Sequence, residues 1–386
     1  MGEIARHERI VVAMSGGVDS SVAAALLHEQ GHEVVGVWMR LHDGADQRSE
    51  FRKSCCSLDA ADDARRVAGQ LGIPFFILDL EREFAAGVLD PFVASYLRGS
   101  TPSPCVDCNT YVKFGALLGR ARLLYGAEAV ATGHYARIDS VPGDGDADDA
   151  DDADGAHRAA GADGRRWRLL TAADPAKDQS YFLYGLRQDQ LARTWFPLGD
   201  LAKPEVRGIA RGLGLVTAEA PESQEICFVA GGDYRETLRE RAGWQETPGP
   251  VVDVDGSAVG QHRGAAAYTV GQRTGLGVAV GERRYVASID VERNLVQLGR
   301  REDLRRRSFV LEAMTFVSGR VPGAAIRCAV RIRHRGALVD ATVHPPDGGH
   351  GWLVEADDPV WAPAPGQAAV LYAGDEVLGG GRIARD

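Results

Sequence analysis

The sequence of 386 residues has no run of apolar residues that approaches the roughly 18 needed to span a bilayer. Its longest apolar runs, such as residues 34–39, have the length of a strand. Residues 1–9 lack the apolar core of a signal peptide, so we expect a cytoplasmic protein. Cysteine is scarce, at six residues, which excludes a small fold held together by disulfides. A hydrophobic fraction of 45% excludes a fibrous or fully disordered chain, and the length predicts about two to three domains.

Charge is spread unevenly along a chain whose formal net charge is −10. Seven aspartates and no basic residue fall within residues 144–154, which leaves −3 for the rest of the chain. Residues 301–335 carry nine arginines against three acids, a local charge of +6. A nearly neutral protein with one basic segment can bind a polyanion through that segment.

Short apolar runs alternate with amphipathic stretches through the N-terminal third of the chain. The pattern predicts strands over residues 10–14, 34–39, 75–80 and 129–132, and helices over residues 20–30, 58–71, 83–97, 111–125 and 181–214. Such alternation is typical of an α/β fold with an open, mostly parallel sheet. Ligands of these sheets bind beyond the carboxyl ends of the strands, where Ser15, Met39 and Gly133 fall.

From residue 249 the sequence changes to short apolar runs broken by Gly, Pro and Asp, which predicts a small all-β module and a barrel. The predicted strands cover residues 250–254, 267–270, 285–290, 295–298, 308–317, 326–333, 338–344, 352–355 and 368–372. Residues 140–166 consist largely of Asp, Gly and Ala without periodicity, which predicts a disordered acidic insertion. We therefore predict a catalytic domain over residues 1–219, a small central domain with the Cys227 loop over 220–302, and a C-terminal β-barrel over 303–386.

Residues 15–21, with the sequence SGGVDSS, lie between a predicted strand and a predicted helix. Glycine lets the backbone approach an anion, the first N–H groups of the helix point at it, and the hydroxyls of Ser15, Ser20 and Ser21 can donate to phosphate oxygens. The loop lacks the lysine of a Walker A loop, which excludes that class of phosphate site. Asp19 is acidic in a place suited to anions, which indicates a carboxylate that holds Mg²⁺ between phosphate oxygens.

Two candidate reactive thiols, Cys105 and Cys108, lie in TPSPCVDCN at residues 101–109. The prolines disfavour helix before them, and a thiol at the start of the helix that follows is shifted toward the reactive thiolate. A CxxC pair also suits a structural zinc site, but zinc needs two further ligands and the sequence has no second CxxC. Cys227, far along the chain, is either a second reactive thiol or a buried inert one.

These strings together closely resemble the bacterial tRNA-specific 2-thiouridylases, a branch of the ATP-pyrophosphatase loop superfamily. The resemblance extends over nearly the whole chain. It rests, in chain order, on AMSGGVDS at residues 13–20, TPSPCVDCN at 101–109, ATGHY at 131–135, KDQSYF at 177–182, EICF at 225–228, TVGQR at 269–273, PGQ at 365–367 and GGG at 379–381.

The resemblance implies an ATP-dependent tRNA sulfurtransferase that uses ATP and Mg²⁺, the latter held through Asp19. ATP would adenylate the C2 carbonyl oxygen of the wobble uridine in certain tRNAs, and sulfur would then replace the AMP. Cys227 matches the position that receives sulfur as a persulfide from a cysteine desulfurase or a relay protein. Cys108 matches the partner nucleophile, which closes a transient disulfide with Cys227. The implied ATP-binding residues are Ala13, Met14, Ser15, Gly16, Gly17, Val18, Asp19, Ser20, Met39 and Gly133.

A wobble uridine is stacked in the anticodon loop, so it must be flipped out to reach two cysteines. The resemblance assigns contacts with the target base or the tRNA to Ser103, Pro104, Cys105, His134, Lys177, Asp178, Gln179, Arg333, His334 and Gln367. Alternation along a predicted strand places Arg331, Arg333 and Arg335 on one face, which suits a phosphate backbone, and residues 305–307 extend this basic track. The loop of residues 218–232 is expected to move between states, because two distant thiols must converge on one base.

Ser103 and Cys105 depart from the family pattern, since many relatives have Asn and Asp at these positions. Cys105, Cys108 and Cys227 could therefore supply three thiolates to an iron–sulfur cluster. We prefer the persulfide and disulfide route, and the cluster stays open as the alternative.

Three further cysteines lie outside these strings. Cys55 and Cys56 are structural or an auxiliary thiol pair, and Cys328 is expected to pack inside the barrel.

Two other functions have different requirements. An amidoligase of the same loop superfamily would need a nitrogen-donor site and no paired cysteines. A non-catalytic RNA-binding protein would not need an intact SGGVDS loop. Both classes therefore fit less well than a sulfurtransferase.

Overall fold

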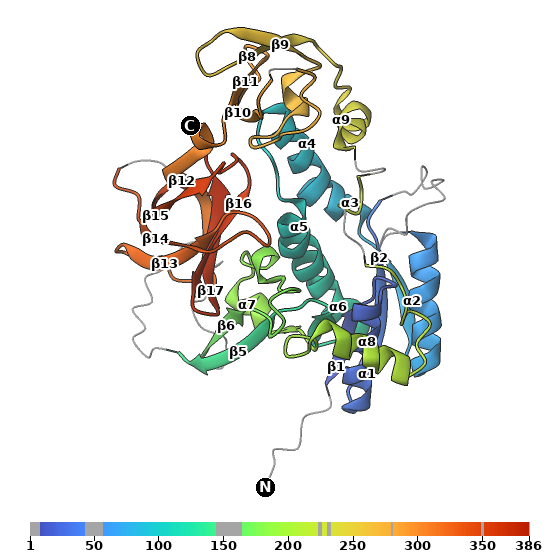
Figure 1. Cartoon of the computed structure of the whole chain (residues 1–386). Coiled ribbons are helices and arrows are strands. Elements are labelled where there is room, and N and C mark those ends of the chain that lie inside the picture. The colour runs from blue at the N-terminus through green and yellow to red at the C-terminus, as the bar shows by residue number, and fades with distance from the viewer. Residues whose placement is uncertain are drawn as a thin grey trace.

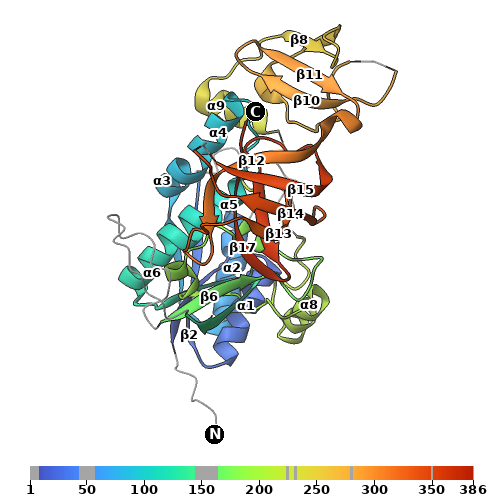
Figure 2. The same cartoon turned by 90° about the vertical axis from the view of Figure 1, so that its left-hand side faces the viewer.

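The computed structural model describes residues 8–42, 57–143, 164–222, 226–229, 233–278, 281–348 and 351–385. In these ranges the chain forms an N-terminal α/β domain, a small central sheet at one end of the molecule, and a C-terminal barrel beside the α/β domain (Figures 1 and 2). None of the helices in these ranges is long and apolar enough to cross a bilayer.

The N-terminal domain is built on a parallel sheet with the strand order β3-β2-β1-β4-β7. Its strands are β1 (Arg9–Ala13), β2 (Glu33–Arg40), β3 (Phe75–Asp79), β4 (Ala129–Thr132) and β7 (Thr194–Trp195). Along the chain, β2 and β3 follow β1 on one side of it, whereas β4 pairs with the other side of β1. Ligands of such sheets bind where the order reverses, which here is between the carboxyl ends of β1 and β4. The predicted α/β fold with a parallel sheet is confirmed.

Helices cover both faces of this sheet because side chains on a strand point alternately to the two sides. Ile10 and Val12 pack into one apolar cluster, with residues of α1, α2 and α8. Val11 and Ala13 pack into the opposite cluster, which also contains η2 and strands of the barrel. The helices are α1 (Val18–Glu29), α2 (Leu58–Leu71), α3 (Glu81–Phe84), α4 (Asp90–Leu97), α5 (Pro104–Asp107), α6 (Leu118–Tyr125) and α8 (Lys203–Gly212), with π-helical turns η1 (Ala85–Leu89) and η2 (Cys108–Leu117).

The prediction of helix over residues 181–214 is wrong for most of that segment. It holds only two short helices, η3 (Ser180–Phe182) and α7 (Gln188–Leu191), before strand β7 and helix α8. Gly185, Gly199 and Pro197 interrupt the helical pattern. β7 then pairs with β4, because a tertiary contact outweighs the weak local preference.

The C-terminal domain is a closed barrel, because β12 pairs with both β15 and β17. The strand order is β12-β15-β14-β13-β16-β17. The strands are β12 (Arg305–Phe316), β13 (Ile326–Arg331), β14 (Val339–His344), β15 (Trp352–Trp361), β16 (Ala368–Ala373) and β17 (Glu376–Ile383). The predicted barrel is confirmed, although the glycine-rich β17 was not among the predicted strands.

The predicted insertion over residues 140–166 is too long at both ends. β5 (Arg137–Pro142) and β6 (Arg165–Leu170) pair antiparallel, and β6 also pairs with β17 of the barrel. Ser140 to Pro142 and Arg165 to Arg166 therefore belong to a hairpin that bonds the α/β domain to the barrel. Backbone pairing outweighs the poor strand composition of these ends. Residues 144–163 lie outside the described residues.

The central domain has a four-stranded sheet in the order β10-β11-β8-β9. Its elements are α9 (Tyr234–Ala242), β8 (Gly249–Val252), β9 (Ala258–His262), η5 (Ala265–Ala267), β10 (Tyr285–Asp290), β11 (Leu295–Gly299) and η6 (Glu302–Leu304). The predicted strand over residues 267–270 is wrong, because a 3₁₀ turn ends there against the sheet.

Candidate nucleotide and cysteine site

The loop after β1 folds back tightly into α1. The Ser15 N–H donates to Oγ of Ser20 at 3.1 Å, and the Ser20 hydroxyl donates to the Gly17 carbonyl at 3.2 Å. Gly16 has a φ of 73°, and a Cβ there would lie 2.2 Å from the carbonyl oxygen of Ala60. Only glycine fits this position, since both its conformation and the space exclude a side chain. The strand–loop–helix unit expected from the sequence is therefore formed.

Gly133 directly follows β4 and packs against the start of α1. A Cβ there would lie 2.6 Å from the backbone N of Ser20 and 2.7 Å from the carbonyl carbon of Asp19. Met39 lies near the carboxyl end of β2 and packs against the same cluster as the end of β1. The structure thus places Gly133 against Asp19 and Ser20 at the switch point of the sheet, and Met39 near the carboxyl end of the neighbouring strand β2.

Replacing Gly133 by alanine is expected to push the first turn of α1 away from β4, because the new Cβ has no room. We expect a loss of about 1–3 kcal/mol in the free energy of unfolding and about tenfold weaker ATP binding. Urea unfolding and nucleotide titration measure both effects. Gly119→Ala is the matched control, because a Cβ at that helical position meets nothing within 4 Å. Wild-type stability and affinity in Gly133→Ala would contradict this packing argument.

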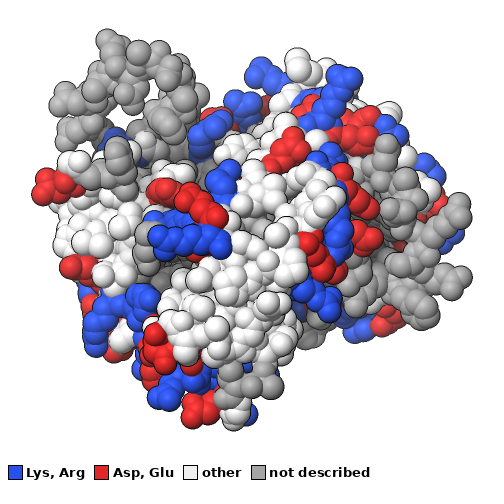
Figure 3. All heavy atoms as spheres, turned by 90° about the horizontal axis from the view of Figure 1, so that it is seen from above, with Lys and Arg blue, Asp and Glu red and all other residues white. Residues whose placement is uncertain are grey.

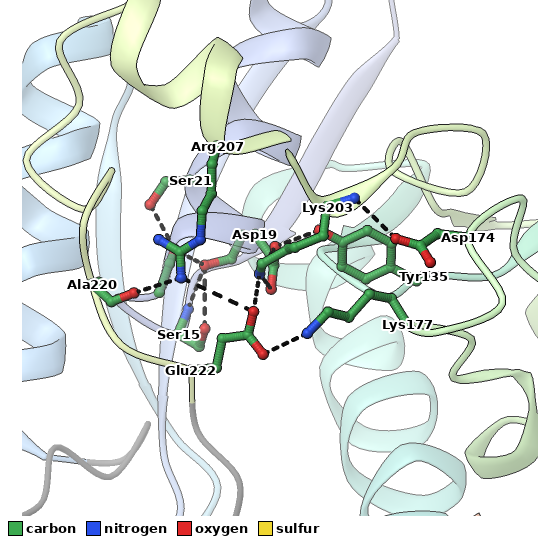
Figure 4. Close-up of polar contacts among 12 residues, drawn as sticks. Ser15, Asp19, Ser21, Tyr135, Asp174, Lys177, Lys203, Arg207, Ala220 and Glu222 are labelled. Atoms are coloured by element: carbon green, nitrogen blue, oxygen red, sulfur yellow. Dashed lines mark hydrogen bonds and ion pairs between the residues drawn. The ribbon is translucent and has the colours of Figure 1, made fainter. Parts of the chain in front are cut away.

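Asp19 is held by a lysine that the sequence did not single out (Figure 4). Nζ of Lys203 donates to the two carboxylate oxygens of Asp19 at 2.7 and 2.8 Å. The Tyr135 hydroxyl donates to the same carboxylate at 2.7 Å. Burial, and then the negative charge of Asp19, raise the pKa of Tyr135, so this hydroxyl stays protonated. The Lys203 side chain is only 8% exposed, which places a desolvated positive charge beside the loop.

Glu222 faces the same group of cations. Its carboxylate lies 2.6 Å from Nζ of Lys177, 3.5 Å from Nζ of Lys203 and 4.0 Å from a guanidinium nitrogen of Arg207. The hydrogen bond from Lys177 is the main reason that the pKa of Glu222 lies below its usual value. Glu222 is therefore ionised, and Figure 4 shows it between Lys177 and the two cations of α8.

The two candidate cysteines belong to one packed region, although 119 positions separate them in the sequence. Cys108 is buried at the start of η2, inside the cluster that includes the end of β1. Cys227 is partly buried and packs against that same cluster. The next residue, Phe228, makes edge contacts with the rings of Phe84 and Phe92, at centroid distances of 5.6 and 5.0 Å.

The remaining cysteines differ in their surroundings. Cys105 is exposed, and Cys328 lies in the barrel core, where burial raises its thiol pKa to about 11. Cys55 and Cys56 lie outside the described residues. Within the described ranges no three His, Cys, Asp or Glu side chains gather as metal ligands. Cys105, Cys108 and Cys227, the possible ligands of an iron–sulfur cluster, therefore do not form a metal site in this conformation, and we derive no step through such a cluster.

The segment expected to touch the target base is fixed against the barrel. Oγ of Ser103 accepts from the N–H of Ala368 at 3.2 Å, and Pro104 begins α5. Nε2 of Gln367 donates to the carbonyl of Thr101 at 3.3 Å. Contacts between the barrel and the α/β domain thus set the position of α5, which carries Cys105 and leads to Cys108.

His134 lies just beyond Gly133, at the end of β4. Its Nδ1 is 2.7 Å from Oγ1 of Thr132, and its ring lies beside those of Phe114 and Phe196. Burial, and to a smaller extent the charge of Lys113, hold its pKa well below the usual histidine value. The imidazole is therefore neutral and can stack on a base or share a hydrogen bond with one.

The three residues of the KDQ string have different surroundings. Lys177 reaches Glu222 as described above, whereas Asp178 is buried and pairs with Arg331 at 3.2 Å. Oε1 of Gln179 accepts from the N–H of Tyr135 at 2.9 Å. In this conformation the side chains of Asp178 and Gln179 make structural contacts within the protein. Of the three residues, Lys177 is the one whose side chain joins the charged group around Asp19 and Glu222.

An open cavity of about 520 Å³ lies between this segment and the barrel, beside the Asp178–Arg331 ion pair. It is lined by Pro175, Ala176, Lys177, Asp178, Arg331, Arg335 and Gly336. Residues predicted separately from two distant strings therefore line one space. The predicted common face of Arg331, Arg333 and Arg335 is wrong, because β13 ends at Arg331 and the chain turns there.

Arg333 points to a different place from its neighbours. Its guanidinium lies over the Trp361 ring at 4.8 Å and donates to the carbonyl of Ala362 at 2.7 Å. The ring of His334 packs at 4.5 Å from that of Phe182. Arg333 therefore packs within the barrel domain, whereas His334 packs between the barrel and the α/β domain.

The basic segment of residues 301–335 does not form a field of one sign. Arg327 is paired with Asp357, and Arg331 with Asp178. Over the face that carries the central domain, acidic and basic side chains are interspersed (Figure 3). Acids from other segments thus offset part of the local charge of +6.

Comparison with known proteins agrees with this arrangement. Residues 8–231 match the family described as the tRNA methyl transferase HUP domain. Residues 235–300 match its PRC-barrel domain, and residues 306–383 match the aminomethyltransferase beta-barrel domain. The "tRNA-specific 2-thiouridylase MnmA" of Roseiflexus castenholzii is 50% identical over 98% of this chain and 100% of its own length. The chain belongs to the family of tRNA-specific 2-thiouridylases.

Other members of the family are nearly as similar. The protein of the same name from Chloroflexus aurantiacus is 48% identical over 97% of this chain and 98% of its own length. That of Moorella thermoacetica is also 48% identical, with the same two coverages. Family membership therefore extends over all three domains.

Sequence reasoning missed Lys203, Arg207 and Glu222. The only local signal is the spacing of Lys203 and Arg207, four residues apart at the start of a helix that Pro204 helps to begin. That spacing is common on solvated helices, so nothing in the sequence separates it from an ordinary surface. The contact with Asp19 appears only when α8 packs beside α1.

Proposed function

We propose that this chain is a tRNA-uridine 2-sulfurtransferase that forms 2-thiouridine, AMP and pyrophosphate from a wobble uridine, ATP and a cysteine persulfide. One observation carries the proposal beyond family membership. Cys108 lies in the apolar cluster that also holds Ala13, the last residue of the strand that leads into the phosphate loop, and Cys227 and Met39 pack against that same cluster.

ATP activates the base in the first step. The C2 carbonyl oxygen of the uridine attacks the α-phosphorus, and pyrophosphate leaves. Lys203, desolvated beside the loop, stabilises the charge that develops on the phosphates. Mg²⁺ bound with ATP would neutralise further phosphate charge, and the single carboxylate of Asp19 fits such an ion, which takes most of its ligands from phosphate and water.

Sulfur replaces AMP in the second step. The terminal sulfur of a Cys227 persulfide attacks C2, and AMP departs with the original oxygen. The Cys108 thiolate then attacks Sγ of Cys227, which forms a Cys108–Cys227 disulfide and releases the 2-thiouridine. An external thiol must reduce this disulfide before the next turnover. Cys105 has no part in this route.

The tRNA would approach along the cavity between the KDQ segment and the barrel. Arg335 lines this cavity together with Lys177 and Arg331, which would turn from their carboxylate partners Glu222 and Asp178 to the phosphates of the tRNA. Neutral His134 would face the flipped base beside the phosphate loop. ATP and tRNA meet in the cytoplasm, which is where we place the reaction.

A single-turnover assay tests the proposal. The protein is mixed with unmodified tRNA, ATP and a persulfide donor, and nucleosides and nucleotides are quantified by mass spectrometry. We expect one 2-thiouridine for each AMP. AMP without 2-thiouridine when the tRNA and the donor are intact, or a methylated nucleoside instead, would refute it.

Cys105→Ser separates the persulfide route from the cluster route. In the persulfide route, the thiolation rate of the variant stays within about tenfold of the wild-type rate, because the exposed thiol of Cys105 takes no part in sulfur transfer. The same assay measures the rate, and anaerobic iron analysis accompanies it. A loss as large as that of a catalytic cysteine would favour the cluster.

A further inference from the structure

Three basic side chains of helix α8 bind the segment of residues 218–222. Lys203, Arg207 and Arg211 are spaced four residues apart, so they lie on one face of the helix. The segment follows α8 in the chain and runs back along it.

These side chains contact both the backbone and the side chains of the segment. Arg207 donates to the carbonyl oxygens of Ala218 and Ala220, at 2.8 and 3.1 Å. Arg211 donates to the carboxylate of Glu219 at 3.2 Å. This last pair lies at the solvent-exposed end of the row, where Glu219 is 76% exposed.

Glu222 ends the segment at the phosphate loop. Of its three cationic partners, Lys203 also bonds Asp19 in that loop, and Arg207 also holds the backbone of the segment. A single carboxylate thus provides negative charge to cations that border a phosphate-binding loop. Bound triphosphate would bring several negative charges to the same place, and the cations cannot pair fully with both.

We propose that Glu222 is a positioning residue that occupies Lys203 and Arg207 until the phosphates of ATP displace it. When these cations turn to the phosphates, residues 218–222 lose contacts with α8. Five residues after Glu222 the chain reaches Cys227, so the arrival of nucleotide loosens the segment that leads to the sulfur-carrying thiol. This inference rests on the proposed function, because it requires a nucleotide at the loop.

Nucleotide titration of Glu222→Gln tests the competition. The probes are α,β-methylene ATP, which cannot be cleaved between the α- and β-phosphates, and adenosine, which has no phosphate. At low ionic strength the variant should bind the ATP analogue about fivefold more tightly than wild type, as expected when one partly exposed ion pair no longer competes. Adenosine affinity should not change, whereas a general disturbance of the site would shift both.

Glu219→Gln is the matched control, since it removes a carboxylate of the same segment that does not reach the phosphate loop. It should bind both probes as wild type does. Equal or weaker analogue binding by Glu222→Gln, an equal gain in Glu219→Gln, or a parallel shift for adenosine would overturn the inference and leave the proposed function standing. Failure of the wild type to bind the analogue at all would overturn both.

Discussion

Replacing Cys227 by serine is expected to lower 2-thiouridine formation by at least about a thousandfold, while tRNA-dependent pyrophosphate release continues. Serine cannot carry a persulfide, so the activated base finds no sulfur. Adenylation uses the phosphate loop and Lys203, none of which the substitution touches. The measurement is a parallel assay of pyrophosphate and of 2-thiouridine from the same reaction.

Cys328→Ser serves as the control for the loss of a thiol. Cys328 is buried in the barrel core, in a different apolar cluster from the one that Cys108 and Cys227 contact, so this variant should keep its thiolation activity even if its stability falls. Thiolation by Cys227→Ser near the wild-type rate would show that sulfur reaches the base by another path. A joint loss of pyrophosphate release and thiolation would show that Cys227 acts before sulfur transfer.

Replacing Lys203 by methionine is expected to slow pyrophosphate release by about 10²- to 10³-fold. Its ammonium is the buried positive charge nearest to Asp19, and removing it leaves the developing phosphate charge without that partner. Asp19→Asn should show a similar loss, because it removes the other half of the same pair. Since the two residues act as a unit, the double variant should lose little more than either single variant.

Arg211→Met is the matched control for Lys203→Met, because Arg211 lies two turns along the same face of α8 and, among the described residues, forms an ion pair with exposed Glu219 and not with Asp19. It should release pyrophosphate at the wild-type rate. Thermal unfolding of each variant shows whether α8 stays in place. A folded Lys203→Met with pyrophosphate release within threefold of wild type would remove Lys203 from the adenylation step.

The sheet and the phosphate loop were predictable because each rests on local signals. The continuous apolar run of β1, which is buried on both faces of the sheet, and the Gly-rich turn after it are both readable in one short string of the sequence. β17 was missed for the opposite reason. Its three consecutive glycines give no alternation, yet a Cβ at Gly379 would lie 2.2 Å from the carbonyl oxygen of Thr315. The close approach of two barrel strands requires those glycines, and it exists only in three dimensions.

The candidate site was predictable only where a motif carried it. The SGGVDS loop and the two distant cysteines could be identified from the resemblance. Lys203 and Glu222 could not, because their meaning comes from partners 184 and 45 residues away in the chain. Asp178 and Gln179 show the opposite case. The KDQ string predicted that both contact tRNA, yet in the structure both side chains form hydrogen bonds within the protein.

The adenylation claim is tested most directly with tRNA whose target uridine carries ¹⁸O at C2. One turnover with ATP and a persulfide donor should give 2-thiouridine and AMP that has gained one ¹⁸O atom, because the base oxygen leaves on the phosphate. Formation of 2-thiouridine with unlabelled AMP would contradict the account, since the oxygen would then have left by a route that does not pass through ATP.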